Sequence, residues 1–316
     1  MGCIEIIGLE KSFGHNIALS SLSLSFTQGE ISCVLGPNGA GKTTLFNIIA
    51  GDLERDSGSI EIFGKAIERY AKTELRKKIV LLPQTFWLYD RLKVSELITL
   101  FERYLHPDRQ RLNMLVSEFD MKAIVHTQLR YLSEGQRRKV GVLVTLMNQD
   151  AELFLLDEPT VGLDPVSRRA VWKVLNEMND AGKTIVFSTH YIEEAERFSD
   201  IVALLNEGNV VRHGKPSRLI SDEFGLKIVI LTIGEPPPSM SIRKDMEQAG
   251  CDFFDGKMEV CLKDEGETLA KVFSLIGQGC VTVKDVSVRR HTLEDVFFKV
   301  TGRVVEEDDP SVPFRA

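Results

Sequence analysis

A glycine-rich segment near the N-terminus has the spacing of a phosphate-binding loop. Its residues fit the pattern G-x-x-x-x-G-K-T and are Gly36-Pro37-Asn38-Gly39-Ala40-Gly41-Lys42-Thr43. Glycines let the backbone turn so that N–H groups point at phosphate oxygens, and a following helix adds its positive dipole end. Lys42 supplies a cation for the β- and γ-phosphates, and the Thr43 hydroxyl can bind Mg²⁺. We therefore predict a nucleotide site, which includes Thr44, rather than a structural turn with a capping threonine.

Two acidic residues and a histidine follow apolar runs that are typical of buried strands. Asp157 and Glu158 come directly after Leu153–Leu156, at the end where α/β sheets place ligand-binding groups. Asp157 suits Mg²⁺, and Glu158 is placed to polarise the water that attacks a γ-phosphate. His190 follows Thr184–Ser188 and can hydrogen-bond a γ-phosphate oxygen. On their own, the acidic pair would be a solvated turn and the histidine structural; the upstream loop favours catalysis.

The elements that carry these residues predict an α/β core. Ile31–Leu35 is a continuous apolar run that leads into the glycine-rich loop, and Lys42–Ala50 has helical spacing. Ile79–Leu82 and the two runs named above have the length and β-branched content of buried parallel strands. Helical stretches lie between them. Closer to the N-terminus, Ile4–Ile7 and Leu19–Phe26 alternate apolar and polar residues, which predicts a small antiparallel β subdomain.

Length and composition narrow the class of protein. A chain of 316 residues favours two domains, and 43% hydrophobic with 27% charged residues is typical of a folded globular protein. The net charge of -7 argues against nucleic acid as a partner, because binding it needs a concentrated basic face. The five cysteines lack any metal-binding spacing, so we expect reduced thiols. No stretch reaches the roughly 18 apolar residues of a membrane span, and no secretory segment is expected.

A second module is expected to start near residue 220. Leu226–Ile233 is a predicted strand, and Gly234-Glu235-Pro236-Pro237-Pro238 then breaks the pattern. The elements after that break are a helix (242–248), a strand, a strand (257–262), a helix (267–276), a strand (281–288) and a helix from Leu293. This βαββαβ order resembles a ferredoxin-like unit. We therefore expect a large domain at 1–220, a small α+β domain at 221–303 and a flexible tail at 304–316.

The stretch between the loop and the acidic pair carries a family resemblance. Leu132-Ser133-Glu134-Gly135-Gln136 is similar to the signature sequence of ABC ATPases, which other P-loop NTPases lack. Further landmarks of that family occur in the family's order, namely Gln84, Gly162-Leu163-Asp164 and Thr189-His190. The resemblance covers roughly residues 4–220. It implies an α/β P-loop NTPase fold of the ABC type, with a mixed sheet, an antiparallel β subdomain and a helical subdomain.

The resemblance also implies a substrate, a cofactor and a dimer. Two ATP molecules with Mg²⁺ would lie between two subunits arranged head to tail, with a homodimer as the expected form. Phe13 would stack on adenine, although a core phenylalanine is the alternative, and Gln84 would reach Mg²⁺ and the γ-phosphate. The other expected site residues are Thr43 and Asp157 for the metal and Lys42, Glu158 and His190 for catalysis.

The signature residues are expected to serve the other subunit's nucleotide. Ser133, Gly135 and Gln136 stand at the start of the helical run Arg137–Met147, where a hydroxyl, backbone N–H groups and the helix dipole favour an anion. In the family that anion is the γ-phosphate bound by the partner. Glu134 departs from the usual glycine, and we expect its carboxylate to point away from the nucleotide.

Two further segments bear on transport. Thr85-Phe86-Trp87-Leu88-Tyr89-Asp90 gathers bulky apolar groups in a surface connection, which suggests a partner; packing within the helical subdomain is the alternative. By resemblance the partner is an integral membrane permease subunit, which places the chain peripherally on the cytoplasmic face of the membrane. The segment His291–Arg303 is similar to the C-terminal sequence of export ATPases for drugs, polysaccharides, lipids and sodium, although Thr292 and Asp295 also fit a helix cap.

We therefore expect the ATP-hydrolysing subunit of an exporter. The alternative is an ABC ATPase that acts on ribosomes or DNA, but those proteins usually join two cassettes or carry a long coiled coil, and neither occurs here. A regulatory module that binds nucleotide without hydrolysis is disfavoured, because Glu158 and His190 are both present.

Overall fold

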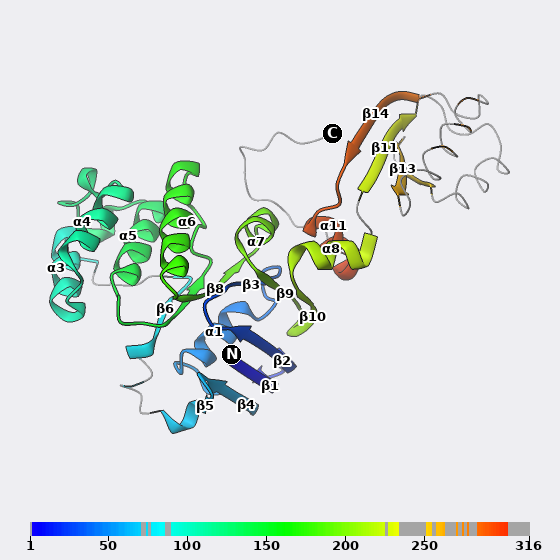
Figure 1. The fold of residues 1–316 in the computed structure, drawn as a ribbon. Helices are drawn as coiled ribbons and strands as arrows, with labels where there is room; N and C mark the ends of the chain where they lie inside the picture. Colours follow the sequence, from blue (N-terminus) through cyan, green and yellow to red (C-terminus); the bar gives the residue numbers. More distant parts are fainter. Residues whose placement is uncertain are drawn as a thin grey trace. The chain divides into compact units, whose positions relative to one another are not determined.

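The computed structural model describes residues 2–70, 74, 77–85, 90–224, 227–233, 251–254, 257–262, 270, 274, 277 and 283–302. The chain divides into two units, the first ending its main segment at Lys215 and the second beginning at Pro216 (Figure 1).

A six-stranded mixed sheet forms the centre of the first unit, in the order β10-β9-β3-β8-β7-β6. Its strands are β3 (Ile31–Leu35), β6 (Ile79–Leu82), β7 (Leu153–Asp157), β8 (Thr184–Thr189), β9 (Ile201–Asn206) and β10 (Asn209–Gly214). All neighbouring pairs are parallel except β9 and β10. Every residue of β3, β7 and β8 is buried, as expected of parallel strands covered on both faces. The carboxyl ends of β3, β8 and β7 therefore meet at one edge.

A second, antiparallel sheet confirms the predicted β subdomain. It has the order β2-β1-β4-β5, with β1 (Gly2–Phe13), β2 (Asn16–Thr27), β4 (Ser57–Ile62) and β5 (Lys65–Ala66). Buried and exposed residues alternate along most of β2, because one face packs on the core. The sequence did not predict β4, β5, β9 or β10. Strands β4 and β10 have weak apolar patterns, because only Ile60 and Ile62 are buried in β4 and no residue is buried in β10.

The helices of the first unit fall into two groups. One group alternates with the sheet strands and comprises α1 (Lys42–Ile49), α6 (Pro165–Asp180) and α7 (Ile192–Phe198). The other lies between β6 and β7 and comprises α3 (Val94–Leu105), α4 (Arg109–Glu118) and α5 (Glu134–Leu146), with the short helices η2 (Met121–Ala123) and η3 (Leu129–Tyr131). A further short helix, η1 (Ile67–Arg69), follows β5. The expected helical subdomain is therefore present.

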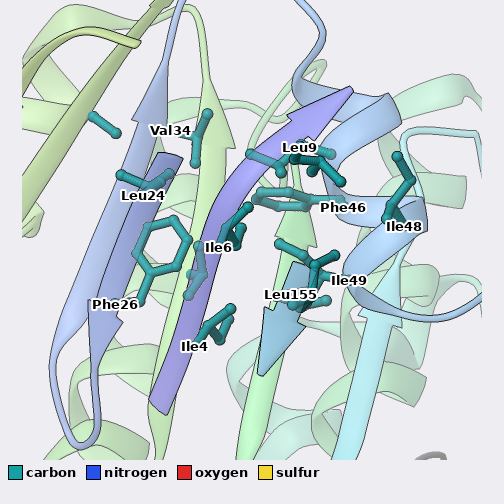
Figure 2. Packing of buried hydrophobic residues seen from close by; sticks show 14 of the residues in the cluster. Ile4, Ile6, Leu9, Leu24, Phe26, Val34, Phe46, Ile48, Ile49 and Leu155 are labelled. Atoms are coloured by element: carbon teal, nitrogen blue, oxygen red, sulfur yellow. The ribbon is translucent and has the colours of Figure 1, made fainter. Parts of the chain in front are cut away.

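One hydrophobic cluster joins the antiparallel sheet to the central sheet through helix α1 (Figure 2). Ile4 and Phe26 contribute from the first sheet, Phe46 from α1, and Val34 and Leu155 from the second. All five are at most 2% exposed. Because α1 begins directly after the glycine-rich loop, the packing of its apolar face fixes where that loop ends.

The second unit combines a four-stranded antiparallel sheet with two helices. The sheet order is β12-β13-β11-β14, with β11 (Lys227–Ile233), β12 (Cys251–Phe254), β13 (Lys257–Leu262) and β14 (Val283–Arg289). The helices are α8 (Pro216–Phe224) and α11 (Leu293–Thr301). Lys299 Nζ donates to Glu223 O at 3.0 Å, and the rings of Phe224 and His291 stack with centroids 4.2 Å apart.

These α8 contacts place the start of the unit at Pro216, slightly before the boundary expected from sequence. The helices expected at 242–248 and 267–276 lie outside the described residues, apart from 270 and 274. The tail expected at 304–316 also lies outside them. Within the described part of the chain, no helix has the length and apolar character needed to cross a membrane.

Replacing Phe46 tests the central cluster. The side chain is fully buried, so Phe46→Ala removes its transfer free energy and leaves a cavity, and we expect a loss of about 3–5 kcal/mol in the free energy of unfolding. The matched control is Ile7→Ala, because Ile7 is 64% exposed and should cost no more than about 0.5 kcal/mol. Urea unfolding measures both. Equal losses in the two variants would show that α1 is not anchored through this cluster.

Candidate functional site

The glycine-rich loop lies between β3 and α1 and depends on glycine at two positions. A Cβ on Gly36 would lie 2.3 Å from the Leu205 carbonyl oxygen, and one on Gly41 would lie 2.4 Å from that of Ala18. Gly41 also has φ 103°, in the left-handed region that favours glycine. Helix α1 starts at Lys42 without a side-chain cap. Its first backbone N–H groups and its positive dipole end therefore suit an anion.

Lys42 points into the site from the first turn of α1. Its Nζ donates to Gly36 O at 2.6 Å and Pro37 O at 3.2 Å, and it lies 3.4 Å from Glu158 Oε1. Lys42 is only 5% exposed. A buried ammonium held by carbonyls and one carboxylate is a fixed positive charge beside the loop, which is what a phosphate group requires.

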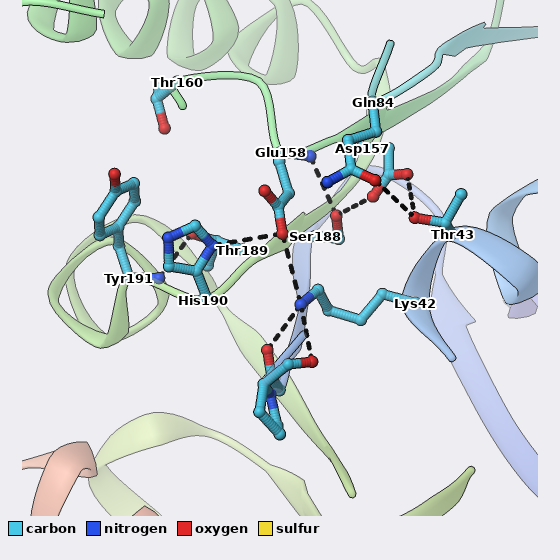
Figure 3. A network of polar contacts seen from close by, with 12 residues as sticks. Lys42, Thr43, Gln84, Asp157, Glu158, Thr160, Ser188, Thr189, His190 and Tyr191 are labelled. Carbon is cyan, nitrogen blue, oxygen red and sulfur yellow. Dashed lines mark hydrogen bonds and ion pairs between the residues drawn. The ribbon is translucent and has the colours of Figure 1, made fainter. Parts of the chain in front are cut away.

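Several side-chain oxygens that could bind a metal ion lie close together near Lys42, on the side away from the Gly36 and Pro37 carbonyls (Figure 3). Thr43 Oγ1 donates to Asp157 Oδ2 at 2.6 Å and lies 3.5 Å from Gln84 Oε1. Ser188 Oγ donates to the second oxygen of Asp157. A hydroxyl, a carboxylate and an amide oxygen are the hard ligands that Mg²⁺ prefers, so these residues fit that ion.

Glu158 lies between Lys42 and His190, as Figure 3 shows. Its backbone has φ 52°, which is unusual for a residue with a side chain. Ser188 holds it there, because Glu158 N donates to Ser188 Oγ at 3.0 Å and to Ser188 O at 3.2 Å. Glu158 Oε1 is 3.3 Å from His190 Nδ1.

The environment of Glu158 keeps its carboxylate ionised. Burial alone would raise its pKa, but the hydrogen bond with His190 and the positive charge of Lys42 outweigh burial. The pKa of Glu158 therefore lies below the ordinary value. An ionised carboxylate can accept a proton from water or hold that water for attack.

An open pocket of about 320 Å³ covers the loop. Of the predicted site residues, the lining includes Phe13, Pro37, Asn38, Gly39, Ala40, Gly41, Lys42, Thr43, Thr44, Gln84 and Glu158. Phe13 is 50% exposed, so it is no core residue. Asp157 and His190 reach the site through Thr43 and Glu158. Asn16 and Ala18 also line the pocket but were not predicted, since nothing in their types signals a role.

The signature residues stand apart from this pocket, at the start of α5. Ser133 caps the helix by accepting from Gln136 N at 3.2 Å, and Gln136 Oε1 accepts from Ser133 N at 3.0 Å. Gly135 lies so close to Gly162 that an added Cβ would be 2.3 Å from its carbonyl oxygen. Glu134 is exposed. Ser133 therefore lies on a different surface of the chain, outside the pocket that contains Lys42.

Sequence reasoning missed the residues that support the site from behind. Ser188 binds Asp157 and Glu158, and Arg138 donates to the main-chain carbonyls of both residues. Glu194 is buried and accepts from Thr160 Oγ1 at 2.7 Å. The parallel pairing of Asp157 with Ser188 was the one available signal, since it follows from two predicted strands. Phe86–Tyr89, expected to contact a partner, lie outside the described residues, whereas Thr85 and Asp90 lie within them.

The pKa of Glu158 gives a pH prediction. A carboxylate whose pKa is lowered on folding stabilises the fold above the ordinary value of about 4.3, and this contribution is lost as pH falls through the lower folded-state pKa. We expect the difference in unfolding free energy between wild type and Glu158→Gln to be largest near neutral pH and to shrink in acid. Urea unfolding at a series of pH values measures it. A difference that grows toward acid would mean that burial dominates and the pKa is raised.

Known sequences similar to this chain extend over nearly its whole length. Residues 19–161 match the family described as ABC transporter. The chain is 30% identical over 308 residues to the Nod factor export ATP-binding protein I of Rhizobium sp. (strain N33), covering 96% of this chain and 98% of the relative. It is 32% identical over 305 residues to a daunorubicin resistance ATP-binding protein of Streptomyces coeruleorubidus, covering 95% and 96%.

Solved structures share the fold. An ATP-binding subunit of an ABC transporter matches with TM-score 0.63 and 27% identity, over 71% of this chain and 93% of that chain. A dimeric bacterial ABC transporter cassette matches with TM-score 0.61 and 27% identity, over 67% and 98%. A post-hydrolysis cassette bound to ADP and Pi matches with TM-score 0.60 and 26% identity, over 67% and 98%. Since sequence relatives and solved cassettes agree, the chain belongs to the ABC transporter family, as an ATP-binding subunit of the ATPase type.

Proposed function

We propose that the pocket over the glycine-rich loop binds ATP with Mg²⁺ and that Glu158 is the base for its hydrolysis. The observation that carries this proposal is the position of the Glu158 carboxylate, 3.4 Å from Lys42 Nζ and 3.3 Å from His190 Nδ1. Both neighbours are groups that can contact a γ-phosphate, so a water held by Glu158 would lie beside the phosphorus it attacks.

Each residue of the site has a separate task in this proposal. The loop backbone and Lys42 bind the phosphates, and Phe13, exposed at the pocket, stacks on the base. Thr43, Asp157 and Gln84 hold Mg²⁺, which neutralises charge on the β- and γ-phosphates. Glu158 accepts a proton from the attacking water, and His190 orients the Glu158 carboxylate and the γ-phosphate.

We further propose that two copies of the chain act together, head to tail. Ser133, Gly135 and Gln136 lie at the start of α5, outside the lining of the Lys42 pocket. An exposed hydroxyl at a helix N-terminus suits a phosphate, and a partner's γ-phosphate would satisfy it. A solved cassette of the same fold is a dimer, which supports this arrangement.

The partner in the membrane is proposed to be a permease subunit of an exporter. Family membership supports a permease, and the Nod factor export and daunorubicin resistance relatives support export. The chain would then lie on the cytoplasmic face of the membrane, held by the segment around Thr85 and Asp90. No nucleic-acid partner is proposed, in keeping with the net charge of -7.

We propose that the second unit is a small ferredoxin-like accessory domain. Its antiparallel sheet order, β12-β13-β11-β14, places the first and third strands together in the middle, as that topology requires. The Asp295 carboxylate caps α11, because it accepts from Thr292 N at 2.9 Å. We place the start of this domain at α8 and its end near residue 303, followed by a tail.

Glu158→Gln tests the catalytic proposal. The amide keeps the size of the side chain but cannot accept a proton, so we expect kcat for ATP to fall by at least about 100-fold. An ATP-bound dimer should accumulate, detected by size-exclusion chromatography with Mg²⁺ and ATP. Glu193→Gln, the same substitution at an exposed position three residues after His190, is the control and should keep wild-type kcat. Undiminished turnover in Glu158→Gln would defeat the assignment of the base.

A further inference from the structure

A buried arginine, Arg138, lies next to the site, and its hydrogen bonds go to main-chain carbonyls outside the phosphate-binding loop. Arg138 is in α5 and is 6% exposed. Its Nη1 donates to Pro83 O at 2.6 Å and Gln84 O at 3.0 Å. Its Nη2 donates to Glu158 O at 2.8 Å and to Asp157 O. One guanidinium therefore holds four main-chain carbonyls from two separate segments.

These carbonyls lie just beyond the point where the hydrogen-bonded pairing of β6 with β7 ends. The parallel pairing of these strands ends at Leu82 and Leu156, so the following residues have no ladder partner across that gap. A planar guanidinium with a fixed fork of N–H donors can bridge the two segments. A lysine ammonium is a single nitrogen and cannot span them in the same way.

The unusual backbone conformation of Glu158 explains why its carbonyl needs a hydrogen-bond donor such as Arg138. Its left-handed conformation persists only where the surroundings determine it from both sides. On one side Glu158 N is bound by Ser188; on the other, Glu158 O is bound by Arg138. Burial lowers the pKa of Arg138 to about 10, with Asp157 and Glu158 opposing that shift, so the guanidinium stays charged at neutral pH.

We propose that Arg138 is a positioning residue for hydrolysis: it fixes the main chain of Glu158 and Gln84 and ties both to the helix that carries Ser133. Arg138 and Ser133 are separated by less than two turns of α5, so a displacement of the signature end is transmitted to the Glu158 and Gln84 carbonyls. The inference rests on the proposed role of Glu158. It predicts that loss of Arg138 impairs the chemical step but leaves binding of the nucleotide by the Lys42 loop intact.

The test is steady-state kinetics of Arg138→Ala and Arg138→Lys, with the exposed Arg169→Ala as the matched control. We expect kcat to fall about 100-fold in the Ala variant, as for a misplaced catalytic group, while KM for ATP and the affinity for a fluorescent ATP analogue stay within about threefold. Added methylguanidinium should restore part of kcat in Arg138→Ala, whereas methylammonium at the same concentration should not. Arg138→Lys should remain impaired, and Arg169→Ala should match wild type.

Three results would overturn the proposal. They are a wild-type kcat in either Arg138 variant, a parallel loss of kcat and nucleotide affinity, and rescue by methylammonium equal to that by methylguanidinium. If Arg138→Ala does not fold, Arg138→Lys provides the test, with the expected result that kcat falls while KM for ATP stays within about threefold of wild type. Failure of the proposed function is a different result, because it would appear as full turnover in Glu158→Gln or as absence of ATP hydrolysis in wild type.

Discussion

The parallel pairing of β3, β8 and β7 is the constraint on which the site depends. Leu35 pairs with Thr189, and Asp157 pairs with Ser188, so three strands end at the same level of one sheet. Each strand is followed at once by a functional segment: the loop that leads to Lys42, the acidic residue Glu158, or His190. No single segment could bring these groups within hydrogen-bonding distance. The buried apolar residues of the sheet therefore fix the geometry of the candidate site as well as the fold.

Nearby charges determine the ionisation of Glu158 at this edge of the sheet. A buried carboxylate is unfavourable on its own, and Glu158 is only 4% exposed. Lys42 and His190 compensate for burial, and Ser188 and Arg138 hold the main chain on either side. These contacts within the protein hold the cluster in place, which limits the reorganisation needed for reaction. Glu158 is the carboxylate that pairs with Lys42 in this structure, and a bound triphosphate would add further negative charge beside the same ammonium group.

Much of the site was predictable from sequence because local patterns determine it. The loop spacing, the apolar run before Asp157 and the strand before His190 predicted three strand ends, and general rules for α/β sheets predicted that they meet. The residues that fix the geometry were not predictable in the same way. Arg138 binds main-chain carbonyls of distant segments, and Ser188 binds the main-chain N–H of Glu158 and the carboxylate of Asp157. Neither residue type marks such a role. The left-handed conformation of Glu158 likewise follows from tertiary contacts rather than from local preference.

The fold shows the same division. Four strands with continuous apolar residues were predicted, namely β3, β6, β7 and β8, but β9 was missed although four of its residues are buried. Strands β4 and β10 were missed because few or none of their residues are buried. The second unit starts at Pro216, a few residues before the expected boundary, because α8 packs with α11, which is far away in sequence. Local patterns thus predicted most of the buried strands of the central sheet, whereas long-range contacts set the start of the second unit.

The most direct test of the account is complementation between two inactive variants. Lys42→Ala removes the phosphate cation, and Ser133→Asp keeps a helix-capping oxygen but sets a negative charge against the partner's γ-phosphate. If each ATP lies between Lys42 of one copy and Ser133 of the other, a mixed dimer has one intact site. Each variant alone should then be inactive, and an equal mixture should recover about a quarter of wild-type ATPase activity, because half the dimers are mixed and each has one working site of two. A mixture no more active than the separate variants would contradict the account.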